Sequence, residues 1–210
     1  MAKKNLNKKA FFITVEGLEG SGKTSVITYL SAFLRGRKYP VKVFREPGST
    51  DVGEKIREIL LDKKNRKLSV HTELLLYLAA RTQLIEEKLM LALGKYDFVI
   101  CDRFFDSTII YQGVGCGLGE IAEKAVALFS LGLEPDLTIF LDAPVETGLS
   151  RIKDKDRIES RPLTFHKKLR KGYLSLAAKY PKRIKVVDAF GSLEEIYSQV
   201  QAVVEKQFFK

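Results

Sequence analysis

Residues 17–24 form the pattern G-x-x-x-x-G-K-T, which restricts the possible folds of this 210-residue chain more than any other feature. Its glycines allow a tight backbone turn that directs N–H groups inward around phosphate groups. Lys23 can place a positive charge on the β- and γ-phosphates of a nucleoside triphosphate, and the Thr24 hydroxyl can bind Mg²⁺. The loop that we expect to hold ATP consists of Gly17, Leu18, Glu19, Gly20, Ser21, Gly22, Lys23 and Thr24.

The residues on either side of this loop have the pattern that such a loop requires. Residues 11–15 form a short run of aromatic and β-branched residues, which is typical of a buried strand. Residues 24–34 carry apolar side chains at helical spacing. A strand, a loop and a helix in this order place the phosphates at a helix N-terminus, where free N–H groups and the helix dipole favour anions.

Strand-like and helical segments alternate along the rest of the chain. Further strands are expected at 41–44, 98–101, 137–141 and 184–187. Helices are expected at 54–61, 72–93, 121–131, from about 145, 165–180 and 193–208. Strands that are apolar on both faces and separated by helices indicate a parallel sheet between two helical layers. We therefore expect one α/β domain over residues 1–210, a five-stranded parallel sheet with helices on both faces and the P-loop NTPase fold.

Charged residues follow the ends of several expected strands, where ligands bind in open α/β sheets. Asp102 comes directly after the third strand and is expected to help place Mg²⁺ together with Thr24. Arg103 can hold an anion beside it, such as the transferring phosphoryl group. A surface ion pair is the alternative interpretation. Arg45 follows the second strand, where a rigid Pro-Gly turn could fix it toward the carboxyl edge of the sheet. An ordinary turn with a solvated arginine is the alternative interpretation.

Two further segments could read a nucleobase. Tyr77 and Arg81 are four residues apart on an expected helix and so share one face, although Tyr77 in the core with Arg81 exposed fits as well. Thr108, Tyr111 and Gln112 supply neutral donors and acceptors of the kind that contact a base edge.

A charged segment within residues 150–162 carries Arg151, Lys153, Lys155 and Arg157. Such a run is usually a solvated surface. A mobile basic lid that covers the substrate and neutralises charge in phosphoryl transfer is the second interpretation.

The composition limits the cellular setting and the partners. The formal net charge is +10, but the lysines are scattered or terminal rather than arranged in a stripe with aromatic residues, so we expect no nucleic-acid partner. No run approaches the roughly 18–20 apolar residues needed to span a bilayer, and the basic residues 1–9 form an expected solvated tail. Two cysteines, Cys101 and Cys116, indicate a reducing, cytoplasmic compartment.

Taken together, the motifs resemble those of the thymidylate kinase family over nearly the whole chain, from residue 11 to about 208. The blocks that carry the resemblance are EGLEGSGKT at 16–24, REPG at 45–48, AAR at 79–81, DR at 102–103, YQG at 111–113, PDL at 135–137 and DRIE at 156–159. The resemblance implies ATP- and Mg²⁺-dependent phosphorylation of dTMP to dTDP in dTTP synthesis, and a homodimer.

The resemblance also implies roles for individual residues. Arg45 and Arg103 would grip the dTMP phosphate, and Glu19 would contact the sugar 3′-hydroxyl. Tyr77, where the family usually has Phe, would stack on thymine while Arg81 binds the base edge. The nucleoside pocket would be lined by Thr108, Tyr111 and Gln112. Lys23, Asp102, Arg103 and Arg151 would be the catalytic residues, with Lys153 and Lys155 also reaching ATP.

The phosphate loop departs from that of some family members in a way that changes where the catalytic positive charge comes from. Some family members carry a basic residue inside the phosphate loop, whereas Leu18, Glu19, Gly20 and Ser21 supply none. The resemblance is then to the bacterial arrangement, in which lid residues supply that charge.

Three alternative functions have different sequence requirements. A kinase acting on another nucleoside monophosphate would differ in the acceptor pocket. A GTPase switch would need an Asn/Thr-Lys-x-Asp motif, which the sequence lacks. A nucleic-acid binder is suggested by the net charge alone.

Overall fold

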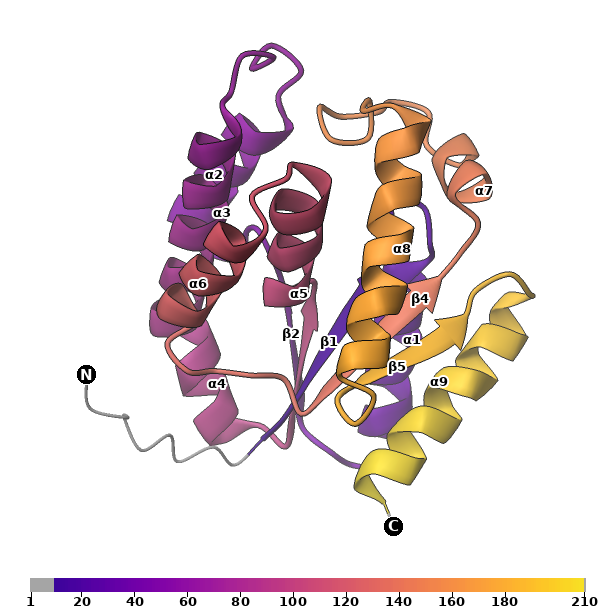
Figure 1. Ribbon diagram of the computed structural model, residues 1–210. Helices are drawn as coiled ribbons and strands as arrows, with labels where there is room; N and C mark the ends of the chain where they lie inside the picture. The colour runs from indigo at the N-terminus through magenta and orange to yellow at the C-terminus, as the bar shows by residue number, and fades with distance from the viewer. Residues whose placement is uncertain (1–9, 210) are drawn as a thin grey trace.

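Five parallel strands in the order β2-β3-β1-β4-β5 form the centre of the molecule, for which a computed structural model describes residues 10–209 (Figure 1). The expected basic tail, residues 1–9, lies outside the described residues. The strands are β1 (Phe11–Gly17), β2 (Val41–Arg45), β3 (Phe98–Asp102), β4 (Leu137–Asp142) and β5 (Ile184–Asp188). This sheet confirms the predicted fold class and all five predicted strands.

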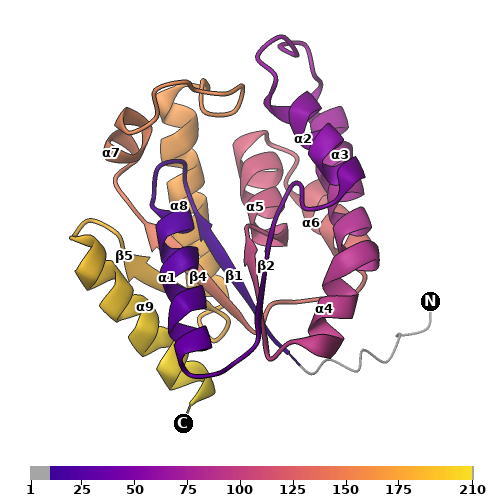
Figure 2. The same cartoon turned by 180° about the vertical axis from the view of Figure 1, so that it is seen from behind.

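Helices α1 (Lys23–Gly36) and α9 (Leu193–Phe208) cover one face of the sheet, as the view from behind shows (Figure 2). The others are α2 (Asp51–Leu61), α3 (Val70–Leu84), α4 (Met90–Lys95), α5 (Phe105–Thr108), α6 (Glu120–Phe129), α7 (Val145–Ser150) and α8 (Leu163–Lys179), with π-helical segments η1 (Ile85–Leu89) and η2 (Ile109–Gly115). Helices α3 to α6 and α8 cover the opposite face.

Alternate residues of each central strand enter different cores, which explains why the strands are apolar on both faces. Phe12 and Val99 pack with the layer of α3, α4 and α6, whereas Ile13 and Ile100 pack with α1 and α9. All four side chains are fully buried. Burial of apolar surface stabilises by about 25 cal/mol per Å², so these two cores supply most of the free energy that holds the layers together.

Two helical segments differ from the sequence-based prediction. Helix α2 begins at Asp51 rather than Glu54, because the Thr50 side chain accepts a hydrogen bond from the Gly53 amide at 2.9 Å and caps the helix three residues earlier. The continuous helical stretch 105–115, formed by α5 and η2, was not predicted. Its glycines and β-branched residues have low helix propensity, and its burial among α3, α6 and α8 overrides that preference.

The predicted helical pattern over 72–93 is one run from Val70 to Lys95 in which η1 separates α3 from α4. Among residues 10–209, none of the helices combines the length and apolar character needed to cross a bilayer.

Candidate active site

The register of the sheet brings the charged residues at the strand ends together. Asp102 at the end of β3 pairs with Val15 of β1 on one side and with Arg45 of β2 on the other. The loop at 17–24 continues directly from β1 into α1. The loop, Asp102 and Arg103 therefore share one edge of the sheet, as expected from their positions after the strands.

Two glycines pack the phosphate loop against α7. A Cβ atom on Gly20, whose φ is +71°, would lie 2.0 Å from the backbone oxygen of Gly148 in α7. A Cβ atom on Gly148 would in turn lie 2.4 Å from the backbone oxygen of Glu19. Because backbone atoms cannot yield at these distances, both positions require glycine. The contact fixes the loop relative to the start of the charged segment at 150–162.

Lys23 is held inside its own loop. Its Nζ donates to the carbonyl oxygens of Gly17 at 3.0 Å and Leu18 at 2.9 Å. Burial, and then the nearby Arg103 charge, lower the pKa of Lys23 to about 8, against the opposing effect of Asp102. A site that destabilises an isolated ammonium group in this way is matched to an anionic ligand that restores the balance.

The two candidate Mg²⁺ ligands meet a simple test of fit. Asp102 Oδ1 is buried and accepts no hydrogen bond from any residue in 10–209. The Thr24 side chain is exposed at the first turn of α1. Both are the oxygen donors that Mg²⁺ prefers, so these residues suit a magnesium ion held jointly with nucleotide phosphates.

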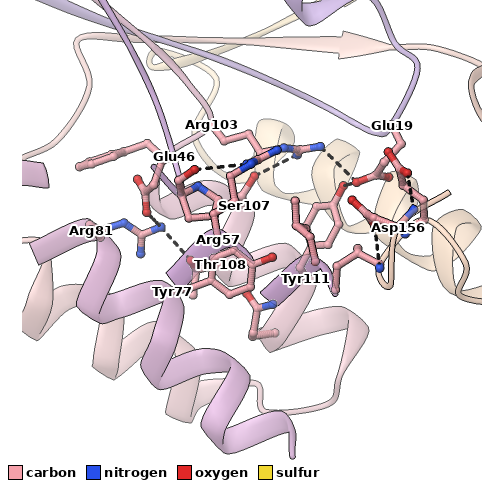
Figure 3. A pocket seen from close by; sticks show the side chains of 16 residues that line it. Glu19, Glu46, Arg57, Tyr77, Arg81, Arg103, Ser107, Thr108, Tyr111 and Asp156 are labelled. Atoms are coloured by element: carbon pink, nitrogen blue, oxygen red, sulfur yellow. Dashed lines mark hydrogen bonds and ion pairs between the residues drawn. The ribbon is translucent and has the colours of Figure 1, made fainter. Parts of the chain in front are cut away.

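Two hollows flank the phosphate loop. The first, here called the inner cavity, is lined by Glu19, Glu46, Pro47, Arg57, Leu61, Tyr77, Arg81, Arg103, Phe104, Ser107, Thr108, Tyr111, Gln112, Asp156, Ile158 and Glu159 (Figure 3). The second, here called the outer cleft, is lined by Gly20, Ser21, Gly22, Lys23, Thr24, Ser25, Val26, Arg151, Gly191, Leu193 and Ile196. The loop thus contributes Glu19 to one hollow and Lys23 to the other.

A buried arginine forms one wall of the inner cavity. Arg81 is 1% exposed, donates through Nη2 to Thr108 Oγ1 at 2.8 Å and pairs with Glu46 at 2.5 Å (Figure 3). Its Nε and Nη1 atoms have no hydrogen-bond partner within residues 10–209. Because Arg81 is buried, the alternative interpretation in which its side chain is exposed is wrong. Burial raises the pKa of Glu46 to about 7, against the lowering effect of Arg81.

Glu19, Arg103 and Tyr111 form the opposite wall. Glu19 Oε1 accepts from the Tyr111 hydroxyl at 2.5 Å and from Arg103 Nη2 at 3.2 Å. His166 Nδ1 lies 3.5 Å from the other carboxylate oxygen. Burial alone would raise the pKa of Glu19, but the adjacent His166 side chain and the Arg103 and Lys23 charges lower it to about 2. Glu19 is thus an anion that can accept a hydrogen bond from a ligand hydroxyl.

Arg103 owes its position to an unusual backbone and a buried carboxylate. Its φ of +68° is rare for a residue with a side chain. The neighbouring Phe104 amide donates to Glu16 Oε1 at 2.8 Å, and the Ser107 hydroxyl donates to Oε2 at 2.7 Å. Burial raises the pKa of the fully buried Glu16, which Arg103 partly offsets. Glu16 therefore holds the turn that aims Arg103 into the inner cavity.

Arg57, which was not predicted from the sequence, lines the inner cavity together with Arg81 and Arg103. Arg57 donates through Nη1 to the Pro47 carbonyl oxygen at 3.2 Å. Its position four residues after the buried Gly53 and three before the buried Leu60 was the available clue, since these spacings place it on the inner face of α2. Arg45 is not among the lining residues. It is about half exposed and pairs with Glu54 at 2.8 Å.

The basic residues of the charged segment at 150–162 separate into two groups. Arg151 lines the outer cleft and donates through Nη1 to the Gly20 carbonyl oxygen at 3.0 Å. Lys153 and Lys155 line neither hollow. Arg157 turns away from the phosphate loop, since its Nε donates to the Leu60 carbonyl oxygen at 2.7 Å and its Nη2 lies 2.7 Å from the buried Glu73. The charged segment is therefore not simply a solvated surface.

A parallel sheet with a phosphate loop between two hollows, one on the Lys23 side and one lined by arginines, defines a P-loop phosphotransferase that acts on a second ligand. Comparison with known proteins narrows this class. The thymidylate kinase family model matches residues 15–200. The chain is 47% identical over 199 residues to the thymidylate kinase of Latilactobacillus sakei, which covers 91% of this chain and 93% of that protein.

Two further proteins agree with this match. The thymidylate kinase of Thermoanaerobacter sp. is 42% identical over 201 residues, covering 94% of this chain and 98% of that protein. The crystal structure of thymidylate kinase from Ehrlichia chaffeensis superimposes with a TM-score of 0.76 at 30% identity, over 93% of this chain and 98% of that one. The chain belongs to the thymidylate kinase family.

Proposed function

We propose that this protein transfers the γ-phosphoryl group of ATP to dTMP, giving ADP and dTDP, as a step toward dTTP. Family membership supports the reaction, and one structural observation supports the acceptor. That observation is the buried Arg81, whose Nε and Nη1 donors are unpartnered within the described chain at the wall of the inner cavity. Unpaired buried donors are costly, so they favour a ligand that presents hydrogen-bond acceptors to them.

The inner cavity would hold dTMP. Tyr77 would stack on the thymine ring, and Arg81, itself held by Thr108, would donate to a thymine carbonyl oxygen. Gln112 would contact the same base edge. Burial raises the pKa of the Tyr77 hydroxyl, so this ring stays neutral beside the base.

The sugar and phosphate of dTMP would extend toward the phosphate loop. Glu19, an acceptor-only anion held by Tyr111, would receive the hydrogen bond of the 3′-hydroxyl. Arg103 and Arg57 would bind the monophosphate, because both line the cavity and guanidinium groups match phosphate oxygens in geometry. Arg57 takes the role first expected of Arg45.

The outer cleft would hold ATP, with the backbone of residues 17–24 and Lys23 around its phosphates. Thr24 and Asp102 would hold Mg²⁺, which when bound neutralises charge on the β- and γ-phosphates. Transfer breaks the bond between the γ-phosphorus and its bridging oxygen and forms a bond to an acceptor phosphate oxygen. Lys23 and Arg103 neutralise charge on the transferring group, and the lid excludes water that would otherwise hydrolyse ATP.

A panel of nucleoside monophosphates tests this proposal. With ATP and Mg²⁺, we expect the highest kcat/KM for dTMP, with dCMP and AMP at least about 100-fold lower, because the cavity offers donors where cytosine and adenine carry an amino group. A coupled assay that measures ADP release for each acceptor gives the ratios. Robust turnover of AMP or CMP without turnover of dTMP would overturn the assignment.

Arg151 tests the lid as the source of catalytic charge. Its guanidinium already reaches the phosphate loop at Gly20, so Arg151→Ala is expected to lower kcat by about 100-fold or more. The matched control is Lys153→Ala, which removes an exposed lid charge that lines neither hollow and should change kcat by less than about threefold. An unchanged kcat in Arg151→Ala, measured at saturating ATP and dTMP, would contradict the assignment.

We further propose that the protein works in the cytoplasm as a homodimer. Helices α3 and α6 pack against each other, and this part of the molecule carries several large exposed apolar side chains, namely Leu75, Leu91, Ile121, Leu128 and Phe129. Apolar surface of this kind marks protein interfaces.

A further inference from the structure

A carboxylate outside the inner cavity connects its base-reading wall to the lid. Glu73 lies in the first turn of α3, is 1% exposed and is not one of the lining residues. Its Oε1 accepts from Gln112 Nε2 at 2.8 Å. Its Oε2 lies 2.7 Å from Nη2 of both Arg157 and Arg161, at the far end of the lid. Three elements distant in sequence therefore meet at one buried charge.

The contact with Glu73 fixes which end of the Gln112 amide faces the inner cavity. An ionised carboxylate accepts hydrogen bonds and cannot donate them, so only the NH₂ group of Gln112 can point at Glu73. No residue in 10–209 donates a hydrogen bond to Gln112 Oε1, and the side chain is otherwise buried against the cavity. Gln112 thus presents a hydrogen-bond acceptor to a ligand in the cavity, and Arg81 presents donors.

This donor and acceptor pair matches one type of pyrimidine edge. Thymine and uracil present a carbonyl oxygen next to an imide N–H, which complement a donor and an acceptor respectively. Cytosine presents an amino group next to an unprotonated ring nitrogen, so both contacts would be mismatched. A site built to hydrogen-bond one pattern rejects the other strongly, because its own buried groups are left unpaired.

We propose that Glu73 is a positioning residue that sets base specificity by holding the Gln112 amide with its oxygen toward the base. This inference rests on the proposed function, since it concerns how the same cavity reads dTMP. The other carboxylate oxygen of Glu73 links base recognition to the lid through its contacts with Arg157 and Arg161. Arg157 is also bound to the Leu60 carbonyl oxygen, and Arg161 donates to Cys116 Sγ at 2.9 Å, so the lid end is fastened on both sides of Glu73.

The two arginines make the isosteric change Glu73→Gln informative. A side-chain amide at this position has one acceptor and one donor end. Two cationic guanidinium groups at 2.7 Å require the acceptor end, which leaves the NH₂ group facing Gln112. Gln112 must then invert and present its own NH₂ to the cavity. The volume of the side chain is unchanged, so an effect on base choice arises from the hydrogen-bond pattern rather than from packing.

The experiment measures kcat/KM for dTMP and dCMP, at saturating ATP, in the intact enzyme and its variants. Glu73→Gln is expected to lower the ratio of the two values by about tenfold or more, with the KM for ATP changed by less than about threefold. Glu73→Asp keeps the charge for the arginines but falls short of Gln112 by one methylene, and it is expected to lower the ratio as well. If Glu73→Gln does not fold, Glu73→Asp provides the test in its place. The control Glu86→Gln, an exposed residue of η1, should leave the ratio unchanged.

A double-mutant cycle separates positioning from a general structural role. In a Gln112→Ala background there is no amide to invert, so adding Glu73→Gln should change the dTMP to dCMP ratio by less than about threefold. The same tenfold fall in both backgrounds, or an unchanged ratio in Glu73→Gln, would overturn the inference. Failure of the proposed function would look different, because the unmodified enzyme itself would then show no preference for dTMP.

Discussion

Replacing Lys23 with alanine is expected to lower kcat for phosphoryl transfer by about 10³-fold, or about 4 kcal/mol of transition-state stabilisation. Lys23 is the loop cation that can follow charge on the β- and γ-phosphates, and burial has already made its isolated charge unfavourable. dTMP binding, measured calorimetrically without ATP, should change by less than about threefold. The control Lys206→Ala removes an exposed lysine of α9 and should leave kcat unchanged.

The lowered pKa of Lys23 adds a pH dependence to ATP binding. With a pKa of about 8 in the free protein, Lys23 is largely neutral at pH 9. Phosphate oxygens favour the charged form, so the pKa of Lys23 rises when ATP binds and the protein takes up a substantial fraction of a proton at that pH. Titration calorimetry in two buffers of different ionisation enthalpy measures this uptake. No uptake at pH 9, or equal uptake in Lys23→Met, would contradict the role of Lys23.

The sequence predicted the phosphate loop and the sheet well because both depend on local patterns. The loop needs glycines at fixed positions, and each strand is a short apolar run whose two faces enter two different cores. The position of Asp102 beside β1 and β2 follows from the same topology. These features need no knowledge of which side chains meet across the molecule.

The composition of the inner cavity was harder to predict because it depends on which long side chains find partners across the fold. Arg45 and Arg57 are twelve residues apart and both basic, yet Arg45 pairs with Glu54 outside the cavity while Arg57 turns inward from α2. Nothing in the sequence around Glu73 distinguishes it from any other acidic residue of the helix expected at 72–93. Its role became visible only when η2 and the lid were seen to converge on it.

Arg81→Ala is expected to raise the KM for dTMP by about 100-fold, equivalent to about 3 kcal/mol, while the KM for ATP changes by less than about threefold. The two hollows lie on opposite sides of the phosphate loop, and Arg81 lines only the inner cavity. Equal losses for both substrates would contradict its role at the base. Arg66→Ala, which removes an exposed arginine from the loop after α2, is the matched control.

The partner of Arg81 makes it possible to separate binding from stability in this variant. Without Arg81, the buried Glu46 loses the charge that opposes its desolvation, so its pKa rises above the value of about 7 that it has in the pair. A carboxyl group whose pKa is higher in the folded than in the unfolded state contributes stability at low pH that is lost as the pH rises. The melting temperature of Arg81→Ala should therefore fall between pH 6 and 8 more than that of the unmodified protein.

Adding Glu46→Gln removes the titrating group, so the double variant should lose that extra pH dependence while its KM for dTMP stays high. Recovery of dTMP affinity along with stability would mean that Arg81 acts only by neutralising Glu46, and its proposed contact with the base would then be wrong.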